Sequence, residues 1–196
     1  HGAGANCSSP LLLALAEAFS ESGFAVLRCD LPFRQNRTHG PPLRTAELDR
    51  AGLKAAVEAL RPQVSGRIFL GGHSYGGRQA TMLATEEPGL VPALLLLSYP
   101  LHPPKNRAQM RTGHFANLHT PAFFVHGSRD GFGTPEEMQE ALRLIPARTQ
   151  LLPVNGAGHE LARKGETGKL ASSVAQAFTR FVAELLMSTK AVIQSR

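Results

Sequence analysis

The chain has 196 residues, enough for one well-buried α/β domain and too few for two domains of ordinary size. Its hydrophobic content of 42% and charged content of 18% are typical of a globular protein and exclude a disordered chain. No apolar run approaches the roughly 18 residues of a membrane-spanning helix. We therefore expect a single domain over residues 1–196 and no membrane insertion.

The formal net charge is +6, and the pI is near 9.9. The sequence nevertheless has no long Lys/Arg run, no Trp and no aromatic residues interleaved with basic ones. Proteins that stack on single strands or grip duplexes show those features, so we expect no nucleic-acid partner. Cys7 and Cys29 fit no metal spacing and no disulfide framework, which predicts free thiols, no metal site and a reducing, cytoplasmic setting.

The first third of the chain predicts a helix over 10–21 and a strand over 24–29. A polar loop rich in Arg, Pro and Gly follows, up to residue 44. Thr45 is the predicted N-cap of the next helix, over 46–61.

The middle of the chain predicts strands over 67–71, 91–97 and 121–126. The segment 99–120 is irregular, with room for one short helix.

The last third begins with Thr134-Pro135-Glu136-Glu137, the pattern of a capping box with proline at the first helical position. A strand over 149–154 and a turn over 155–159 come next. A final helix carries one apolar stripe: Leu170, Val174, Phe178, Phe181, Val182 and Leu185.

This alternation of strands and helices predicts a three-layer α/β/α sandwich around a mostly parallel sheet. Ligands of such sheets bind at the carboxyl ends of the strands. Ser74, Asp130 and His159 each follow a predicted strand, so we expect them at the same edge of the sheet.

Ser74 lies in Gly72-His73-Ser74-Tyr75-Gly76, where a strand turns into a helix. A Gly-x-Ser-x-Gly turn in this context holds a nucleophile in a strained conformation above the sheet. In a glycine-rich chain, such a pattern also arises by chance or at phosphate-binding turns. A base and an acid further along the chain are needed to decide between these interpretations.

Ser74, Asp130 and His159 occur in the order nucleophile, acid, histidine. In this hypothesis His159 removes the Ser74 proton, and Asp130 fixes the tautomer of His159. The alternative for Asp130 is a simple turn residue. Other histidines are weaker candidates, because His126 lies within a strand, His73 is expected to point away, and three others precede the acid: His102, His114 and His119.

His1-Gly2-Ala3-Gly4 is the type of loop that lends a backbone N–H to an oxyanion hole. We expect the N–H groups of Ala3 and Tyr75 to be the two donors.

On these motifs, namely HGAGAN, GGHSYGGRQA, the GSRD turn and the GAGH turn, the whole chain resembles the α/β-hydrolase superfamily. It is most similar to the dienelactone-hydrolase-like branch, which includes the testis-expressed and NSL-complex-subunit hydrolase-like proteins. The resemblance implies acyl transfer to water through a serine ester, without a cofactor. Dienelactone hydrolases proper carry Cys where this chain has Ser74, so their particular activity is not implied.

The sequence is therefore compatible with two functions. One is a serine hydrolase of a small ester, thioester or related acyl compound, and the other is an idle α/β-hydrolase fold that serves as a binding or scaffold module. The segment 99–120 is too short for the multi-helix lid of lipases. We therefore expect an open site that prefers short substrates. The oligomeric state is not predicted.

The resemblance also implies a central strand directly before the HGAG loop, between the strands at 24–29 and 67–71. That strand is missing from the sequence, so we expect a gap in the sheet and residues upstream of His1.

Basic side chains follow the carboxyl ends of several predicted strands, and we expect them around the mouth of the site. Arg34, Arg37 and Arg107 are predicted substrate-binding residues for acyl compounds with a carboxylate or phosphate. The alternative is that all are ordinary solvated loop residues. The full set is Arg34, Arg37, Arg44, Lys105, Arg107, Arg111, Arg129, Arg163 and Lys164.

Overall fold

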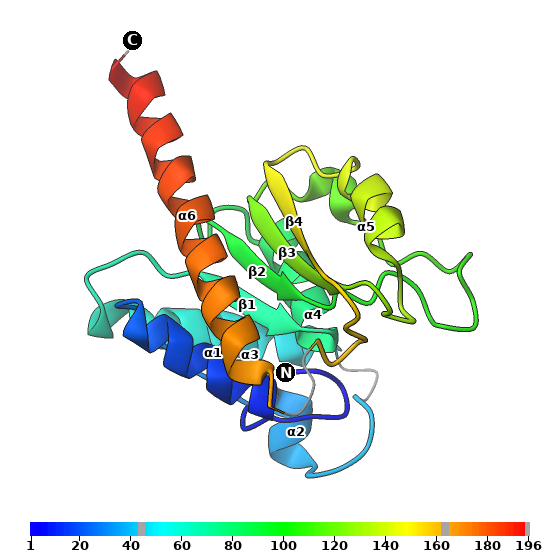
Figure 1. The fold of residues 1–196 in the computed structure, drawn as a ribbon. Coiled ribbons are helices and arrows are strands. Elements are labelled where there is room, and N and C mark those ends of the chain that lie inside the picture. Colours follow the sequence, from blue (N-terminus) through cyan, green and yellow to red (C-terminus); the bar gives the residue numbers. More distant parts are fainter. Residues whose placement is uncertain (43–45, 162–164, 195–196) are drawn as a thin grey trace.

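The computed structural model describes residues 1–42, 46–161 and 165–194, with side chains described as far as Met187. Within these ranges, four strands form one parallel sheet in sequence order (Figure 1). They are β1 (Leu70–His73), β2 (Leu94–Leu97), β3 (Ala122–Gly127) and β4 (Thr149–Val154). The carboxyl ends of all four strands therefore meet at one edge.

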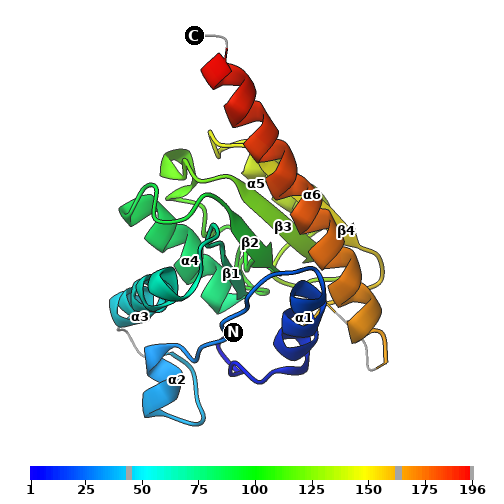
Figure 2. The ribbon, with the colours of Figure 1, turned by 90° about the vertical axis from the view of Figure 1, so that its left-hand side faces the viewer.

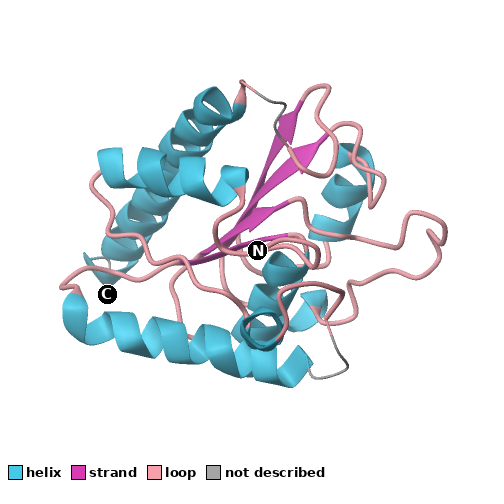
Figure 3. Ribbon diagram, turned by 90° about the horizontal axis from the view of Figure 1, so that it is seen from below, coloured by secondary structure: helices cyan, strands magenta, loops and turns pink. Residues whose placement is uncertain are grey.

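Helices cover both faces of this sheet (Figures 2 and 3). One face packs against α1 (Pro10–Glu21) and the long α6 (Thr167–Gln194). The other face packs against α3 (Ala46–Leu60), α4 (Tyr75–Glu86) and α5 (Pro135–Leu142). The predicted three-layer α/β/α sandwich with a parallel sheet is confirmed.

The two layers follow from the alternation of side chains along buried strands. In β2, Leu94 and Leu96 belong to the core under α3, α4 and α5, whereas Leu95 and Leu97 belong to the core under α1 and α6. All four leucines are buried. A strand buried on both faces reads as a continuous apolar run, which is why the sequence identifies β2 so clearly.

Local capping chemistry sets several helix boundaries. Thr134 accepts a hydrogen bond from the N–H of Glu137, and Glu137 accepts one from the N–H of Thr134, so the predicted capping box is confirmed. The predicted N-cap Thr45 lies outside the described residues. The short helix expected within 99–120 is the single 3-10 turn η2 (Phe115–Asn117), and a second such turn, η1 (Arg61–Gln63), follows α3.

One short helix was not predicted. The loop expected after residue 30 contains α2 (Pro32–Asn36), with Pro32 in its first turn. The carbonyl of Leu31 accepts hydrogen bonds from the N–H groups of Arg34 and Gln35 at 2.7 and 3.1 Å. Proline is favourable at the first helical position because it has no N–H to lose and its φ is already helical.

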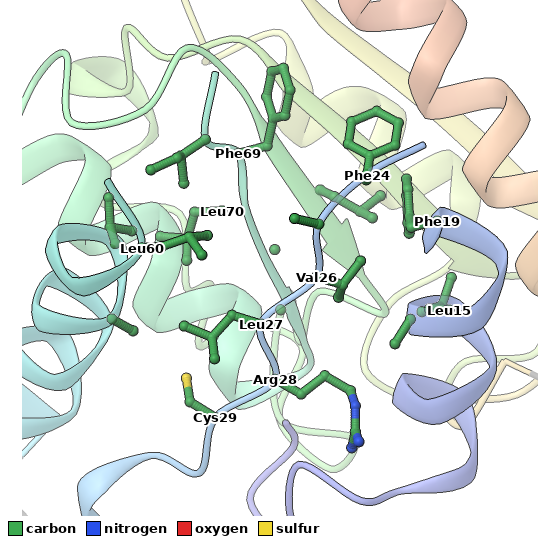
Figure 4. Close-up of a pocket in the computed structure, with 18 of the residues that line it drawn as sticks. Leu15, Phe19, Phe24, Val26, Leu27, Arg28, Cys29, Leu60, Phe69 and Leu70 are labelled. Atoms are coloured by element: carbon green, nitrogen blue, oxygen red, sulfur yellow. The ribbon is translucent and has the colours of Figure 1, made fainter. Parts of the chain in front are cut away.

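The segment 24–29 is extended, but the prediction that it is a strand of the sheet is wrong for the described residues, because it joins no ladder. A groove of about 810 Å³ separates it from β1, the edge strand of the sheet (Figure 4). Val26 and Leu27 line this groove and are 41% and 50% exposed. The groove therefore lies at the expected gap, and without a hydrogen-bonded neighbour the segment is no strand.

On the other side of β1, helix α4 approaches the strand backbone to backbone. A Cβ placed on Gly72 would lie 2.4 Å from the backbone nitrogen of Gly77. A Cβ on Gly77 would in turn lie 2.7 Å from the carbonyl oxygen of Gly72. Only glycines allow α4 to start directly behind β1, and this contact fixes the position of the turn between them.

We expect Gly72→Ala to lower the free energy of unfolding by about 3 kcal/mol, because its methyl group collides with backbone that cannot move aside. Urea denaturation measures this change. Gly66→Ala is the matched control, since a Cβ at Gly66 meets nothing within 4 Å, and it should stay within about 0.5 kcal/mol of wild type. Equal stability of the two variants would contradict the close contact.

Candidate active site

Ser74 joins β1 to α4 in a conformation that non-glycine residues rarely adopt. Its φ is 52° and its ψ is −114°, and it is the N-cap residue of α4. The strained turn predicted at this position is therefore present. Its N–H donates to the carbonyl of Leu97 on β2 at 2.8 Å, which ties the turn to the sheet. The positive end of the α4 dipole points at this residue.

Ser74, His159 and Asp130 form a continuous chain of hydrogen bonds. His159 Nε2 lies 2.7 Å from Ser74 Oγ, and His159 Nδ1 lies 2.8 Å from Asp130 Oδ2. An ionised carboxylate can only accept, so Nδ1 carries the ring proton and Nε2 is left to accept from the Ser74 hydroxyl. The structure thus brings these three predicted residues together in one hydrogen-bonded series.

Two turns supply the acid and the histidine, and they are held together by backbone contacts. Asp130 follows β3, and His159 follows β4. The N–H of Arg129 donates to the carbonyl of Ala157 at 2.8 Å, and the N–H of Gly156 donates to Ser128 Oγ at 2.8 Å. These two hydrogen bonds join the turns and set the separation of Asp130 and His159.

Asp130 is fully buried yet favours its charged form. Burial alone would raise its pKa, but hydrogen bonds from His159 and from the N–H of Phe132 outweigh burial and hold the pKa below its ordinary value. The ring of Phe132 also packs on His159, with centroids 4.2 Å apart. Asp130 and Phe132 together fix the orientation of the imidazole.

His73 lies closer to this group than the sequence predicted. It was expected to point away from the site, but its Nε2 lies 2.9 Å from the carbonyl oxygen of His159. Burial lowers its pKa, so the ring is neutral and can donate its Nε2 proton to that carbonyl. His73 thereby fixes the backbone of the turn that carries His159. The alternation of side chains along a strand gave no signal of this contact.

His126 lies behind the acid, as a buried residue of β3. Its Nε2 donates to the carbonyl of Gly133 at 2.8 Å and lies 3.7 Å from Asp130 Oδ2. Burial lowers the pKa of His126, which keeps it neutral. The expectation that it is a core histidine agrees with this position.

The predicted oxyanion donors lie on either side of Ser74. A Cβ on Gly2 would lie 3.5 Å from the Cβ of Ser74, so the loop that carries Ala3 passes over the serine. The carbonyl of His1 accepts from the N–H of Gly76 at 3.1 Å and anchors this loop to α4. Within the described residues, the N–H groups of Ala3 and Tyr75 have no hydrogen-bond acceptor. Both remain available to a ligand.

A buried carboxylate that the sequence analysis missed supports this region. Asp49 of α3 is 1% exposed. It accepts from the hydroxyl of Tyr75 at 2.6 Å and from the N–H of Phe33 at 3.0 Å. Asp49 therefore links α3 and α2 to the residue after Ser74. In the sequence, an aspartate in the middle of a helix looks the same whether it is buried or exposed to solvent. Only the packing of the helices reveals that Asp49 holds Tyr75 and Phe33.

Two of the three predicted substrate-binding arginines, Arg34 and Arg107, contact groups within the protein. The buried guanidinium of Arg34 donates four hydrogen bonds to backbone carbonyls, those of Ala3, Ala5, Arg37 and Gly40. Arg107 is 72% exposed and lies 3.5 Å from a Glu137 oxygen, and Arg37 is exposed. Arg34 thus holds the loop over Ser74 in place. Three residues of the predicted rim lie outside the described residues: Arg44, Arg163 and Lys164.

The described side chains contain no group of three or more His, Cys, Asp or Glu residues that could hold a metal ion. Cys7 and Cys29 are free. In the described part of the chain, no helix combines the length and the apolar character needed to cross a bilayer.

A family model described as alpha/beta hydrolase domain matches residues 1–187. The chain belongs to this alpha/beta hydrolase family. Solved structures of similar fold include Est1E from Butyrivibrio proteoclasticus, at 17% identity and a TM-score of 0.73, with 93% of this chain and 86% of that chain covered. Dienelactone hydrolase from Anabaena variabilis has 23% identity and a TM-score of 0.72, covering 92% and 83%.

A third similar structure is XC6422 from Xanthomonas campestris, described as an α/β serine hydrolase without lid. Its identity is 16% and its TM-score 0.68, with 90% of this chain and 75% of that chain covered. At these identities, the likeness to solved structures is a likeness of fold.

His114 provides a pH-dependent test of the packing beside α4. Its Nε2 lies 2.8 Å from Thr81 Oγ1. Burial, followed by the positive charge of Arg78, lowers its pKa to about 4, and Glu86 opposes this shift. As pH falls, the unfolded chain therefore binds a proton at His114 before the folded chain does. The contribution of His114 to the free energy of unfolding is greatest above pH 6.5 and is lost as pH falls toward 4.

We therefore expect His114→Gln, which keeps a donor for Thr81 but cannot be protonated, to weaken the pH dependence of stability. Between about pH 6.5 and 5 the wild type should lose on the order of 1 kcal/mol more than this variant, since His114 is partly exposed. Urea denaturation at both pH values measures the difference. His119→Gln, at an exposed position, should keep the wild-type slope.

Proposed function

We propose that this alpha/beta hydrolase is a serine hydrolase that cleaves a small ester, thioester or related acyl compound through an acyl-enzyme. The observation that carries the proposal is the hydrogen-bonded series Ser74, His159, Asp130, with distances of 2.7 and 2.8 Å, at a serine held with φ of 52°. Strain at the serine and a base already in contact with its hydroxyl are what nucleophilic catalysis requires.

In the proposed reaction, the Ser74 oxygen attacks the substrate carbonyl while His159 Nε2 takes the hydroxyl proton. Asp130 stabilises the resulting imidazolium through Nδ1. The N–H groups of Ala3 and Tyr75 donate to the oxygen that becomes negative. His159 then returns the proton to the leaving group, and a water molecule activated by the same histidine releases the acid and restores Ser74.

The segment between β2 and β3 supports a preference for small substrates. Its regular structure within the described residues is the single turn η2, and Tyr99 and Leu101 of this segment are buried in the core. A multi-helix lid that would bury a long acyl chain is therefore absent from this segment. The Xanthomonas relative is likewise described as a hydrolase without lid. The narrower likeness to the dienelactone-hydrolase-like branch remains a prediction.

A fluorophosphonate probe tests the nucleophile directly. We expect the purified protein to form a covalent adduct at Ser74, because the probe needs an activated serine and an oxyanion site. Mass spectrometry of the intact protein and of its peptides measures the adduct. Ser74→Ala should not react, and Ser98→Ala, at another serine with positive φ, should react like wild type. A folded wild-type protein that stays unlabelled would instead favour an idle binding module.

Substitutions of Ser74, His159 and Asp130 should lower kcat in a non-additive way, because the three residues are proposed to act together. Ser74→Ala or His159→Ala is expected to lower kcat by about 10⁶, and Asp130→Asn by about 10⁴, with a short-chain 4-nitrophenyl ester as substrate. The double variant Ser74→Ala, His159→Ala should be no slower than either single one. Circular dichroism checks that each variant is folded. Mild and additive losses would contradict a triad.

A further inference from the structure

A cluster of polar side chains outside the triad contains two arginines and no carboxylate. We call it the arginine cluster: Arg78 and Thr81 of α4, and Tyr99, Arg111 and His114 of the segment after β2. Thr81 Oγ1 lies 2.8 Å from His114 Nε2, and the hydroxyl of Tyr99 donates to the carbonyl of Arg111 at 2.7 Å. The first bond joins α4 to the segment after β2, and the second ties the backbone of Arg111 to Tyr99 within that segment.

The two guanidinium groups lie near each other and lack counter-charges. Arg78 Nε is buried and has no hydrogen-bond partner, and Arg111 Nη1 has one long contact, 3.5 Å to the carbonyl of Pro100. Neither arginine takes part in an ion pair among the described residues. Glu86, whose charge reaches this cluster, is paired with Arg50 at 2.7 Å.

The titration behaviour of the cluster agrees with this geometry. Burial lowers the pKa of Arg111, and the positive charge of Arg78 lowers it further. The pKa of His114 is lowered for the same two reasons, so its ring stays neutral. Two cations held close together and partly out of water are unfavourable unless an anion joins them.

The cluster lies beside the candidate active site. The N–H of Arg78 donates to the carbonyl of Ser74 at 3.0 Å, which places the backbone of Arg78 one helical turn beyond the serine. The segment that carries Tyr99 and Arg111 also reaches the other residues of the site. The N–H of His102 donates to the carbonyl of Phe132 at 3.1 Å, and Phe132 packs on His159.

We propose that Arg78 and Arg111 form an anion-binding subsite that holds a carboxylate or phosphate group of the acyl substrate while its carbonyl lies at Ser74. Guanidinium groups suit this role because they donate in a planar fork that matches both anions. The inference rests on the proposed hydrolase function and narrows its substrate class to anionic acyl compounds. It also replaces Arg34, Arg37 and Arg107 as the residues that select such substrates.

Binding is tested first, separately from catalysis. Glutarate and inorganic phosphate, each at millimolar concentration and at constant ionic strength, are titrated into the Ser74→Ala protein by calorimetry and thermal shift. We expect at least one of them to bind and raise the melting temperature, and the tighter of the two to identify the anion. Adding Arg78→Gln or Arg111→Gln should weaken binding about tenfold or more. Arg143→Gln, an exposed arginine of the same charge far along the chain, should leave binding unchanged.

Selectivity is tested next, with the 4-nitrophenyl monoester of glutaric acid and the uncharged 4-nitrophenyl pentanoate. In Arg78→Gln and Arg111→Gln, kcat/KM for the anionic ester should fall roughly 10- to 100-fold, mostly through KM, and that for the neutral ester less than about twofold. Equal losses for both esters, or anion binding that survives both substitutions, would overturn the proposal.

Failure of the proposed hydrolase function and failure of the anion subsite would give different results. If neither ester is hydrolysed, the hydrolase function fails, while calorimetry still decides the anion subsite. If a Gln variant does not fold, Arg78→Lys and Arg111→Lys take its place, since they keep the charge and lose the fork. Lysine variants should bind the anion more weakly than wild type, and undiminished binding by both would count against the subsite.

Discussion

The close approach of α4 to β1 is the contact on which the candidate site depends. Gly72 and Gly77 let two backbones meet where any Cβ would collide. The chain must therefore turn within one residue, and Ser74 takes up the strain, with φ of 52°. The same helix start exposes the N–H of Tyr75 and bonds Gly76 to the carbonyl of His1. One glycine contact thus sets the positions of Ser74, of the Tyr75 N–H and of the loop that carries Ala3.

The acid and the histidine depend on a second constraint of the same kind. A Cβ on Gly127, at the end of β3, would lie 2.5 Å from the carbonyl oxygen of Ala157. The turn after β4 can therefore rest against the turn after β3, and Asp130 and His159 come within 2.8 Å. This geometry rests on the packing of backbone against backbone at Gly127. The hydrogen bond from His73 then fixes the backbone of the turn that carries His159, and the ring of Phe132 packs on the imidazole.

Signals that are local in sequence predicted the fold, and they pointed to three residues that the structure places within hydrogen-bond distance of one another. The capping box at Thr134, the apolar run of β2 and the order of Ser74, Asp130 and His159 each follow from short-range chemistry. What the sequence could not predict depends on contacts between distant segments. The segment 24–29 has strand composition but no neighbour across the groove, Asp49 has the spacing of a solvated helix residue, and His73 reaches a turn 86 positions along the chain.

The arginines show most clearly the difference between what the local sequence predicts and what contacts between distant segments decide. The sequence shows only that several arginines lie near the ends of predicted strands. In the structure, Arg34 donates to backbone carbonyls, including those of the loop over Ser74, and these carbonyl dipoles compensate its charge. Arg78 and Arg111 form no ion pair among the described residues, and Arg78 Nε has no hydrogen-bond partner. Two cations held close together without counter-charges are stabilised by an anion that binds between them. In the proposed reaction, the same two arginines would therefore select an anionic substrate through binding, while the dipole of α4 and the oxyanion donors act on its carbonyl.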